Sequence, residues 1–329
     1  MLYNNTRAFR PADEPHLTAT PTATARPDDA FDAFRQDRVY LGADHRRNER
    51  RTWIVAAITV LALAAQLAGG LAFNSMALIA GGLHSAAHVA ALVVAAIAYR
   101  LARRYAADPR FSFGTGKLGY LAGFANAVVL AFTALLIAAE SIERLIAPEE
   151  VAYTEALWLA AAGLALSIVC MLILKPAGHR RRPDGDVNLS AVHLHLSADA
   201  IVSGLAIAGL FAGRALDWTW ADPLAGLAGA ALVAHFALSL VRQASGVLLD
   251  VNPSPKLAEE IRGRLAAAGE RILDLHLWQL GPDHHAAIVV IAADRPAPAE
   301  AYRARLAGLP GLSHLTIEVR GDGATHSHA

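Results

Sequence analysis

The 329-residue sequence is poor in charged residues and has a single cysteine. Charged residues make up 18% of the chain, against about 25% in an average soluble domain. The lone Cys170 excludes an intramolecular disulfide and a cysteine-rich metal site. Lysine plus arginine and aspartate plus glutamate number 29 each, so the net charge is zero. We therefore expect no broad basic surface and no nucleic-acid partner.

The shortage of charge is concentrated in six apolar segments. Each has about 20 residues or more, enough to cross a hydrocarbon core of about 30 Å at about 1.5 Å per residue. Six such segments in succession are too many for the rest of the chain to cover, which predicts a membrane α-helical bundle of six transmembrane helices. The segments are 53–73, 76–99, 118–139, 154–174, 189–213 and 220–240.

Positive charge gathers at alternate ends of these segments. Four arginines precede the first segment, and the second and fourth loops contain five and four basic residues. The first loop has none, whereas the third and fifth have one arginine each, Arg144 and Arg214. Because cytoplasmic loops are rich in lysine and arginine, we expect a multi-pass protein of the cell (inner) membrane with both termini in the cytoplasm.

The regions outside the apolar segments predict three further parts. Residues 1–50 are polar and of low complexity, which predicts a disordered cytoplasmic tail before the transmembrane domain at 51–245. Residues 246–320 show the order helix, strand, strand, helix, strand, typical of a small cytoplasmic α+β layer. A core of this size is marginal alone, so we expect this domain to dimerise. Residues 321–329 form a flexible tail with His326 and His328.

Ionisable residues occur at membrane depth in two of the segments. The second contains His84 and His88, and the fifth contains His195 and Asp199. A spacing of four residues places each pair within about 40° on one helix face. A carboxylate at this depth is costly unless it pairs, faces water or binds a cation. Three imidazoles and one carboxylate facing each other would form a tetrahedral site for a divalent transition metal. The alternative is that polar groups within the bundle satisfy the histidines.

Five motifs together indicate a family. They are NSMALIAGGLHSAAH (74–88), FGTGK (113–117), HLSAD (195–199), DPLAG (222–226) and DLHLW (274–278). With these motifs the chain, from about Leu41 to Val319, resembles the cation diffusion facilitator family of divalent-metal exporters. The run PRFSFGTGK (109–117), with histidine at both positions of the second segment, is most similar to the DmeF-type cobalt and nickel branch.

The resemblance implies a secondary transporter that moves divalent metal out of the cytoplasm in exchange for protons. It implies a homodimer with a ferredoxin-like cytoplasmic domain, and no enzymatic activity or resident cofactor. The transported substrate would be Co²⁺, Ni²⁺ or Zn²⁺, with Cd²⁺ and Fe²⁺ as further candidates. Two alternatives stay open, a membrane-embedded metalloenzyme and a non-transporting metal sensor. The implied transport site is His84, His88, His195 and Asp199.

The sequence also departs from the family pattern. Gly81 stands where the family commonly has aspartate, and this removes an acidic group near the site. In the second loop, Asp108 is kept, but Phe111 and Thr115 replace histidines of zinc-exporting relatives. A second, regulatory metal site is predicted in the C-terminal domain, with a solvated surface and one core histidine as the alternative. Its candidate ligands are His276, His284, His285, His314 and Glu318.

Overall fold

The structure is a computed structural model, and it describes residues 39–42, 44–72, 76–148, 153–174, 186–252, 254–293 and 295–321. Side chains of residues 69, 70, 76–84 and 87 lie outside this description. The same holds for the predicted tail before residue 39, most of the fourth loop, and the C-terminal tail with His326 and His328.

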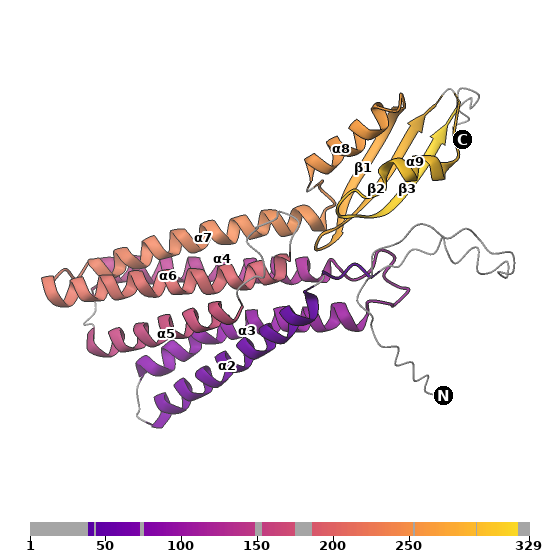
Figure 1. The fold of residues 1–329 in the computed structure, drawn as a ribbon. Helices are drawn as coiled ribbons and strands as arrows, with labels where there is room; N and C mark the ends of the chain where they lie inside the picture. Colours follow the sequence, from indigo (N-terminus) through magenta and orange to yellow (C-terminus); the bar gives the residue numbers. More distant parts are fainter. Residues whose placement is uncertain are drawn as a thin grey trace, which may run out of the picture. The chain divides into compact units, whose positions relative to one another are not determined.

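Long helices cover all six predicted apolar segments in the described part of the chain (Figure 1). Five of these helices, all except α3, are long and apolar enough over described residues to cross a membrane. The side chains of 76–84 in α3 are outside the description, so the sixth span stays a prediction. The helices are α2 (His45–Ala72), α3 (Met76–Arg104), α4 (Leu118–Ile146), α5 (Tyr153–Ile173), α6 (Val187–Leu216) and α7 (Ala221–Leu248).

Alanines are prominent among the buried contacts between the helices, and several large apolar side chains face outward. Helix α4 packs along α7 and α6, α2 along α3, and α5 along α6. Their buried contacts include Ala127, Ala191 and Ala237. Large side chains such as Phe132 and Phe211 are exposed instead. This distribution is typical of helices that approach each other closely within lipid.

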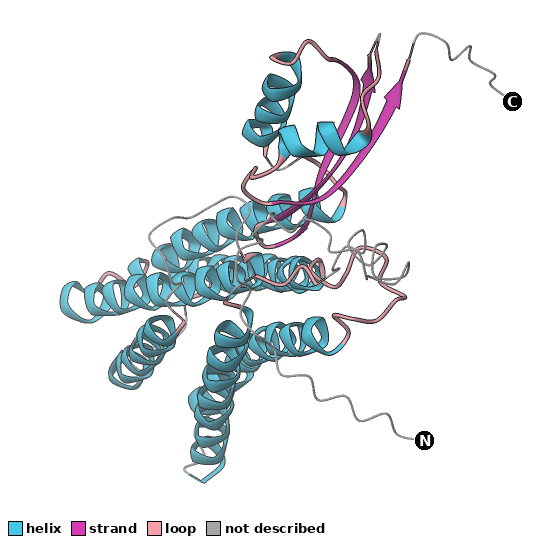
Figure 2. Ribbon diagram, turned by 45° about the vertical axis from the view of Figure 1, so that its right-hand side comes forward, coloured by secondary structure: helices cyan, strands magenta, loops and turns pink. Residues whose placement is uncertain are grey.

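The C-terminal region folds into a three-stranded sheet within the described residues (Figure 2). The order is β1-β2-β3, with β1 antiparallel to β2, and β2 parallel to β3 through the crossover helix α9. This confirms the predicted succession of elements, whereas a ferredoxin-like fold stays a prediction. The elements are α8 (Pro255–Ala266), β1 (Arg271–Gly281), β2 (His284–Ala292), α9 (Ala299–Leu306) and β3 (Leu312–Arg320).

Both helices of this region share one core with the sheet. Ile261 and Leu265 of α8, Tyr302 of α9 and Val289 and Ile291 of β2 are fully buried together. On β1, by contrast, Leu273 is 48% exposed, so the sheet keeps an uncovered apolar position within the single chain.

The sheet meets the loop before α4 at a backbone-to-backbone contact. A Cβ atom on Gly116 would overlap the carbonyl oxygen of Leu280, and one on Gly281 would overlap that of Tyr40. Glycine is therefore required at both positions by the close approach of three chain segments. Beside them, the Gln279 amide donates a hydrogen bond of 2.7 Å to the hydroxyl of Tyr120 in α4.

A second polar cluster ties the start of α6 to α2 and α3. Asp186 caps α6 by accepting a hydrogen bond from the Leu189 amide at 3.0 Å. Its other carboxylate oxygen accepts from the Tyr99 hydroxyl of α3 at 2.5 Å and the Asn48 amide of α2 at 2.8 Å. Helix α2 begins at His45, so the last six residues of the predicted disordered tail are helical, and Asn48 among them contacts Asp186.

We predict that Gly116→Ala lowers the melting temperature of the detergent-solubilised protein. The added methyl group must displace backbone atoms, and overpacking of this kind costs about 1–3 kcal/mol. The matched control is Gly263→Ala in α8, whose Cβ meets nothing within 4 Å. Because alanine favours a helix over glycine by about 0.5–1 kcal/mol, the control should not lower stability. An unchanged melting temperature for Gly116→Ala would contradict the close approach.

We predict that Tyr99→Phe also destabilises the bundle. It removes a hydrogen bond to a carboxylate, an interaction that contributes about 1.5–3 kcal/mol. Tyr105→Phe is the control, because no hydrogen bond joins the Tyr105 hydroxyl to a described residue. Thermal unfolding of both variants measures the difference, and equal melting temperatures would argue against the Asp186 cluster.

Candidate metal-binding site

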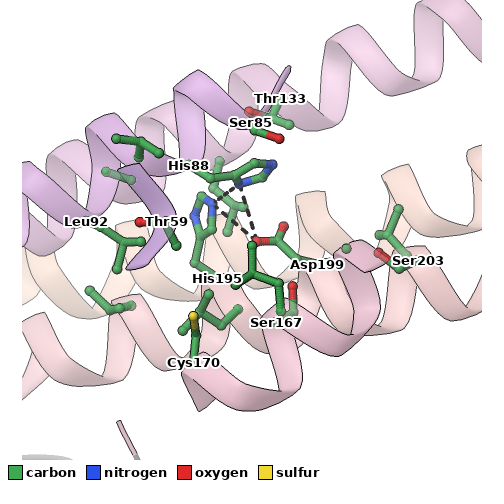
Figure 3. A pocket seen from close by; sticks show the side chains of 18 of the residues that line it. Thr59, Ser85, His88, Leu92, Thr133, Ser167, Cys170, His195, Asp199 and Ser203 are labelled. Carbon is green, nitrogen blue, oxygen red and sulfur yellow. Dashed lines mark hydrogen bonds and ion pairs between the residues drawn. The ribbon is translucent and has the colours of Figure 1, made fainter. Parts of the chain in front are cut away.

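Three of the four predicted ligands converge between α3 and α6 (Figure 3). His88 Nδ1 lies 2.5 Å from His195 Nε2 and 3.3 Å from Asp199 Oδ2. His195 Nε2 lies 3.8 Å from the same carboxylate oxygen. Among the described residues, this is the one group of three or more histidine, cysteine or acidic side chains with ligand atoms close enough to hold a metal ion.

The triangle of ligand atoms suits a small divalent ion. Two tetrahedral ligands at about 2.0–2.1 Å from Zn²⁺ lie about 3.3–3.4 Å apart. Both distances to the Asp199 oxygen, 3.3 and 3.8 Å, are close to that value. The two imidazole nitrogens are closer, at 2.5 Å. Separating these rings by less than about 1 Å would give all three atoms the spacing of a metal site.

A hydrogen bond between the two helices sets the level at which the ligands meet. The buried Asn188 side chain of α6 donates to the Ala95 carbonyl of α3 at 3.0 Å. His195 lies seven residues, or about 10 Å, further along α6 than Asn188. His88 lies seven residues before Ala95 on α3. Because α3 and α6 run in opposite directions, these steps lead the same way and bring both rings to one depth.

The ligands form part of the wall of a cavity of about 190 Å³. His195 is buried at 5% exposure, and the side chains of His88 and Asp199 are 18% and 20% exposed. Figure 3 shows the two rings and the carboxylate pointing toward one another. An ion held here would lie inside the bundle but next to open space through which it could leave.

His84 is the fourth predicted ligand. It precedes His88 by one turn of α3, and its side chain lies outside the described residues. A spacing of four residues places it on the same face as His88, so its role stays a prediction.

Asp108, the candidate of the second loop, lies in an ion pair. The guanidinium of Arg110 donates to its carboxylate at 2.8 Å, and this hydrogen bond holds the pKa of Asp108 below its usual value. The carboxylate does not belong to the described three-ligand group, so a metal site at Asp108 stays a prediction.

The candidates of the C-terminal domain have separate partners. His276 bonds to Asp274 at 2.8 Å, and Glu318 accepts from Arg320 at 2.7 Å. The described residues include no three-ligand cluster among them, so a regulatory metal site there stays a prediction. The remaining contacts join His284 to Ser313, His285 to the Gly311 carbonyl, and His314 to the Phe113 ring.

Burial also distinguishes one of these histidines. His284 is partly enclosed where it packs against the Tyr40 ring, and desolvation lowers the pKa of its imidazole. Its ring nitrogen Nδ1 already has a partner, because it lies 2.7 Å from the Ser313 hydroxyl.

Apart from Ser85, which lies within the motif at 74–88, the structure adds polar cavity residues that the motifs do not include. Several follow the ligands or each other at helical spacing, such as Ser203 one turn after Asp199, and this periodicity is the signal that would have found them. Ser85 donates to Gln66 across α2 and α3 at 3.2 Å. The polar residues lining the cavity beside the ligands are Thr59, Gln66, Ser85, Asn126, Thr133, Ser167 and Ser203.

Comparison with known proteins gives a consistent result. A family model described as the cation efflux transmembrane domain matches residues 52–249. The zinc transporter ZitB of Yersinia pestis is 30% identical over 279 residues, covering 83% of this chain and 88% of that protein. The metal cation efflux system protein CzcD of Cupriavidus metallidurans is 28% identical over 307 residues, covering 88% and 95%.

A third relative is the cadmium, cobalt and zinc/H(+)-K(+) antiporter of Bacillus subtilis, 27% identical over 269 residues, with 79% of this chain and 85% of that protein covered. All three relatives are named as transport proteins, which favours transport over the metalloenzyme alternative. The matched membrane domain, the apolar helices and these relatives lead to one conclusion: the chain is a multi-pass membrane protein of the cation efflux family, also called the cation diffusion facilitators.

Proposed function

We propose that the chain exports divalent transition-metal ions from the cytoplasm and holds each ion between α3 and α6. The observation that carries this proposal is the convergence of His88, His195 and Asp199 on one cavity inside an apolar helix bundle. Relatives named as zinc, cadmium and cobalt transporters support it. His84 would complete a site of three imidazoles and one carboxylate.

Proton exchange follows from the chemistry of these ligands. A metal ion binds neutral imidazole and ionised carboxylate, so binding displaces any protons held in the empty site. Histidine changes its charge in the physiological range, which makes the imidazoles the proton carriers. On a more acidic side of the membrane, protons would displace the ion and reset the site.

The donor set suits Co²⁺, Ni²⁺ and Zn²⁺. Affinity alone is a poor guide to the physiological ion, because the same N/O site binds these metals in an order fixed by the metals themselves. Similarity to the DmeF-type branch favours cobalt and nickel, while the names of the relatives favour zinc, cadmium and cobalt. Cd²⁺ and Fe²⁺ remain further candidate substrates.

The remaining architecture is proposed from the charge pattern and the fold. Helix α3 would be the sixth span, and both termini would lie in the cytoplasm of a cell whose inner membrane holds the protein. The C-terminal region would adopt a ferredoxin-like fold and form a homodimer. Its exposed Leu273 on β1 supports a partner on that face of the sheet.

We predict that Asp199→Ala abolishes metal flux in proteoliposomes and weakens metal binding by more than about 100-fold, because loss of a ligand exceeds the usual effect of an outer-shell partner. Ser197→Ala is the control on the same helix. The Ser197 hydroxyl bonds to the His193 carbonyl at 2.7 Å and lies outside the cavity lining. Full flux through folded Asp199→Ala would show that the site is wrongly placed.

We further predict that metal affinity falls as the pH drops below about 6.5, the ordinary pKa of histidine. Protons then compete with the metal for the imidazoles, and binding above this pH should release fewer protons per ion. The measurement is a metal titration of purified protein across pH, with proton release recorded in the same samples. Constant affinity between about pH 5.5 and 8 without proton release would exclude antiport through these ligands.

A further inference from the structure

We infer that Asn126 of α4 determines which metal the site accepts, because its side-chain amide binds water that the ion keeps in the cavity. The inference rests on the proposed function of the same site. It assigns a role to a third helix, α4, in addition to the two that supply the ligands.

The side chain of Asn126 is buried, but its amide nitrogen is unpaired within the described part of the chain. Only 3% of the residue is exposed, and its Nδ2 atom has no hydrogen-bond partner among the described residues. The amide nitrogens of the other buried asparagines in the bundle differ, because that of Asn188 donates to the Ala95 carbonyl and that of Asn48 to Asp186. The carbonyl oxygen Oδ1 of Asn126 also has no hydrogen-bond partner among the described residues, but unlike the nitrogen it is not fully enclosed, so a group in the cavity can reach it.

The packing of α4 against α6 places Asn126 beside the ligands. A Cβ atom on Gly119 would lie 3.5 Å from Asn188, and one on Gly123 would lie 3.1 Å from Val187 and 3.8 Å from Ala191. Further along both helices, Ala127 and Leu130 of α4 are buried with Ala191 and Ala198 of α6, so the two helices run in the same direction. One further turn brings Asn126 to the level of His195. Asn126 lines the cavity that also contains the three ligands.

The amide chemistry fits water held by a metal ion. Such water has its oxygen on the metal and can only donate hydrogen bonds outward. The carbonyl oxygen of Asn126 accepts them without any change in the orientation of the amide. Outer-shell groups of this kind orient bound water and change metal affinity.

Metal ions that prefer different coordination numbers would respond differently to this contact. Four tetrahedral ligands complete the preferred coordination of Zn²⁺. A site of three imidazoles and one carboxylate therefore binds Zn²⁺ without an additional water ligand. Ni²⁺ in nitrogen and oxygen sites prefers tetragonal geometries, which need further ligands. An oxygen acceptor beside the site therefore favours Ni²⁺, and Co²⁺ in its six-coordinate form, over Zn²⁺.

The test compares the full-length Asn126→Leu variant with the unmodified protein, both purified. Leucine has a similar volume but no polar group. We expect Ni²⁺ affinity to fall about tenfold or more, while Zn²⁺ affinity changes less than about twofold. The visible absorption of bound Co²⁺ should become more intense, as it does when six-coordinate cobalt becomes four-coordinate. Ser141→Ala, a buried polar position of α4 outside the cavity, should leave all three readouts unchanged.

The outcomes separate this inference from the proposed function. If Ni²⁺ and Zn²⁺ affinities fall together, or neither changes, Asn126 does not determine specificity. In that case Asp199→Ala still tests the site itself: if it abolishes Co²⁺ binding, the metal site stands and only the role of Asn126 is lost. If Co²⁺ binding survives Asp199→Ala, the site and this inference both fall. Asn126→Ala, which is smaller, provides the same comparison if the leucine variant fails to fold.

Discussion

The charge of Asp199 is the constraint on which the arrangement of the bundle depends. A carboxylate among apolar helices is tolerated only next to groups that stabilise it. Here two imidazoles lie 3.3 and 3.8 Å from it, one from the same helix and one from α3. The pairing requires α3 and α6 to hold a fixed register. The Asn188 hydrogen bond to Ala95 and the cluster around Asp186 provide that register at one end of both helices.

These contacts close the cavity toward the Asp186 end, whereas polar residues line it on the other side of the ligands. The polar cluster of Asp186, Tyr99 and Asn48 lies about two to three turns from the ligands, toward the start of α6. Between them, apolar side chains from α2, α3, α5 and α6 are buried together, including Val55, Leu92 and Leu189. Polar cavity residues such as Gln66 and Ser203 lie beyond the site in the other direction. An ion that leaves toward the Asp186 end must therefore separate α3 from α6.

Much of this could be predicted from the sequence, because the decisive patterns are local. The length of the apolar segments predicted the helices, and a spacing of four residues predicted that His195 and Asp199 share one helix face. What could not be predicted depends on contacts distant in the chain. The contact of Asn48 in α2 with Asp186 joins residues far apart in the sequence, and Gly116 is required by the backbone of β1. In the sequence, Asn126 is equally consistent with lining the metal path and with helix packing, and only the register of α4 against α6 brings it to the cavity.

The position of the lone cysteine has a practical consequence. Cys170 is fully buried in α5, and it also lines the cavity that contains the metal ligands. A thiol-directed reagent can therefore modify the chain at one position in the unaltered sequence, and only when that cavity admits it. The rate of labelling becomes a native reporter of solvent access to the bundle, comparable between metal-free and metal-loaded protein without any engineered cysteine.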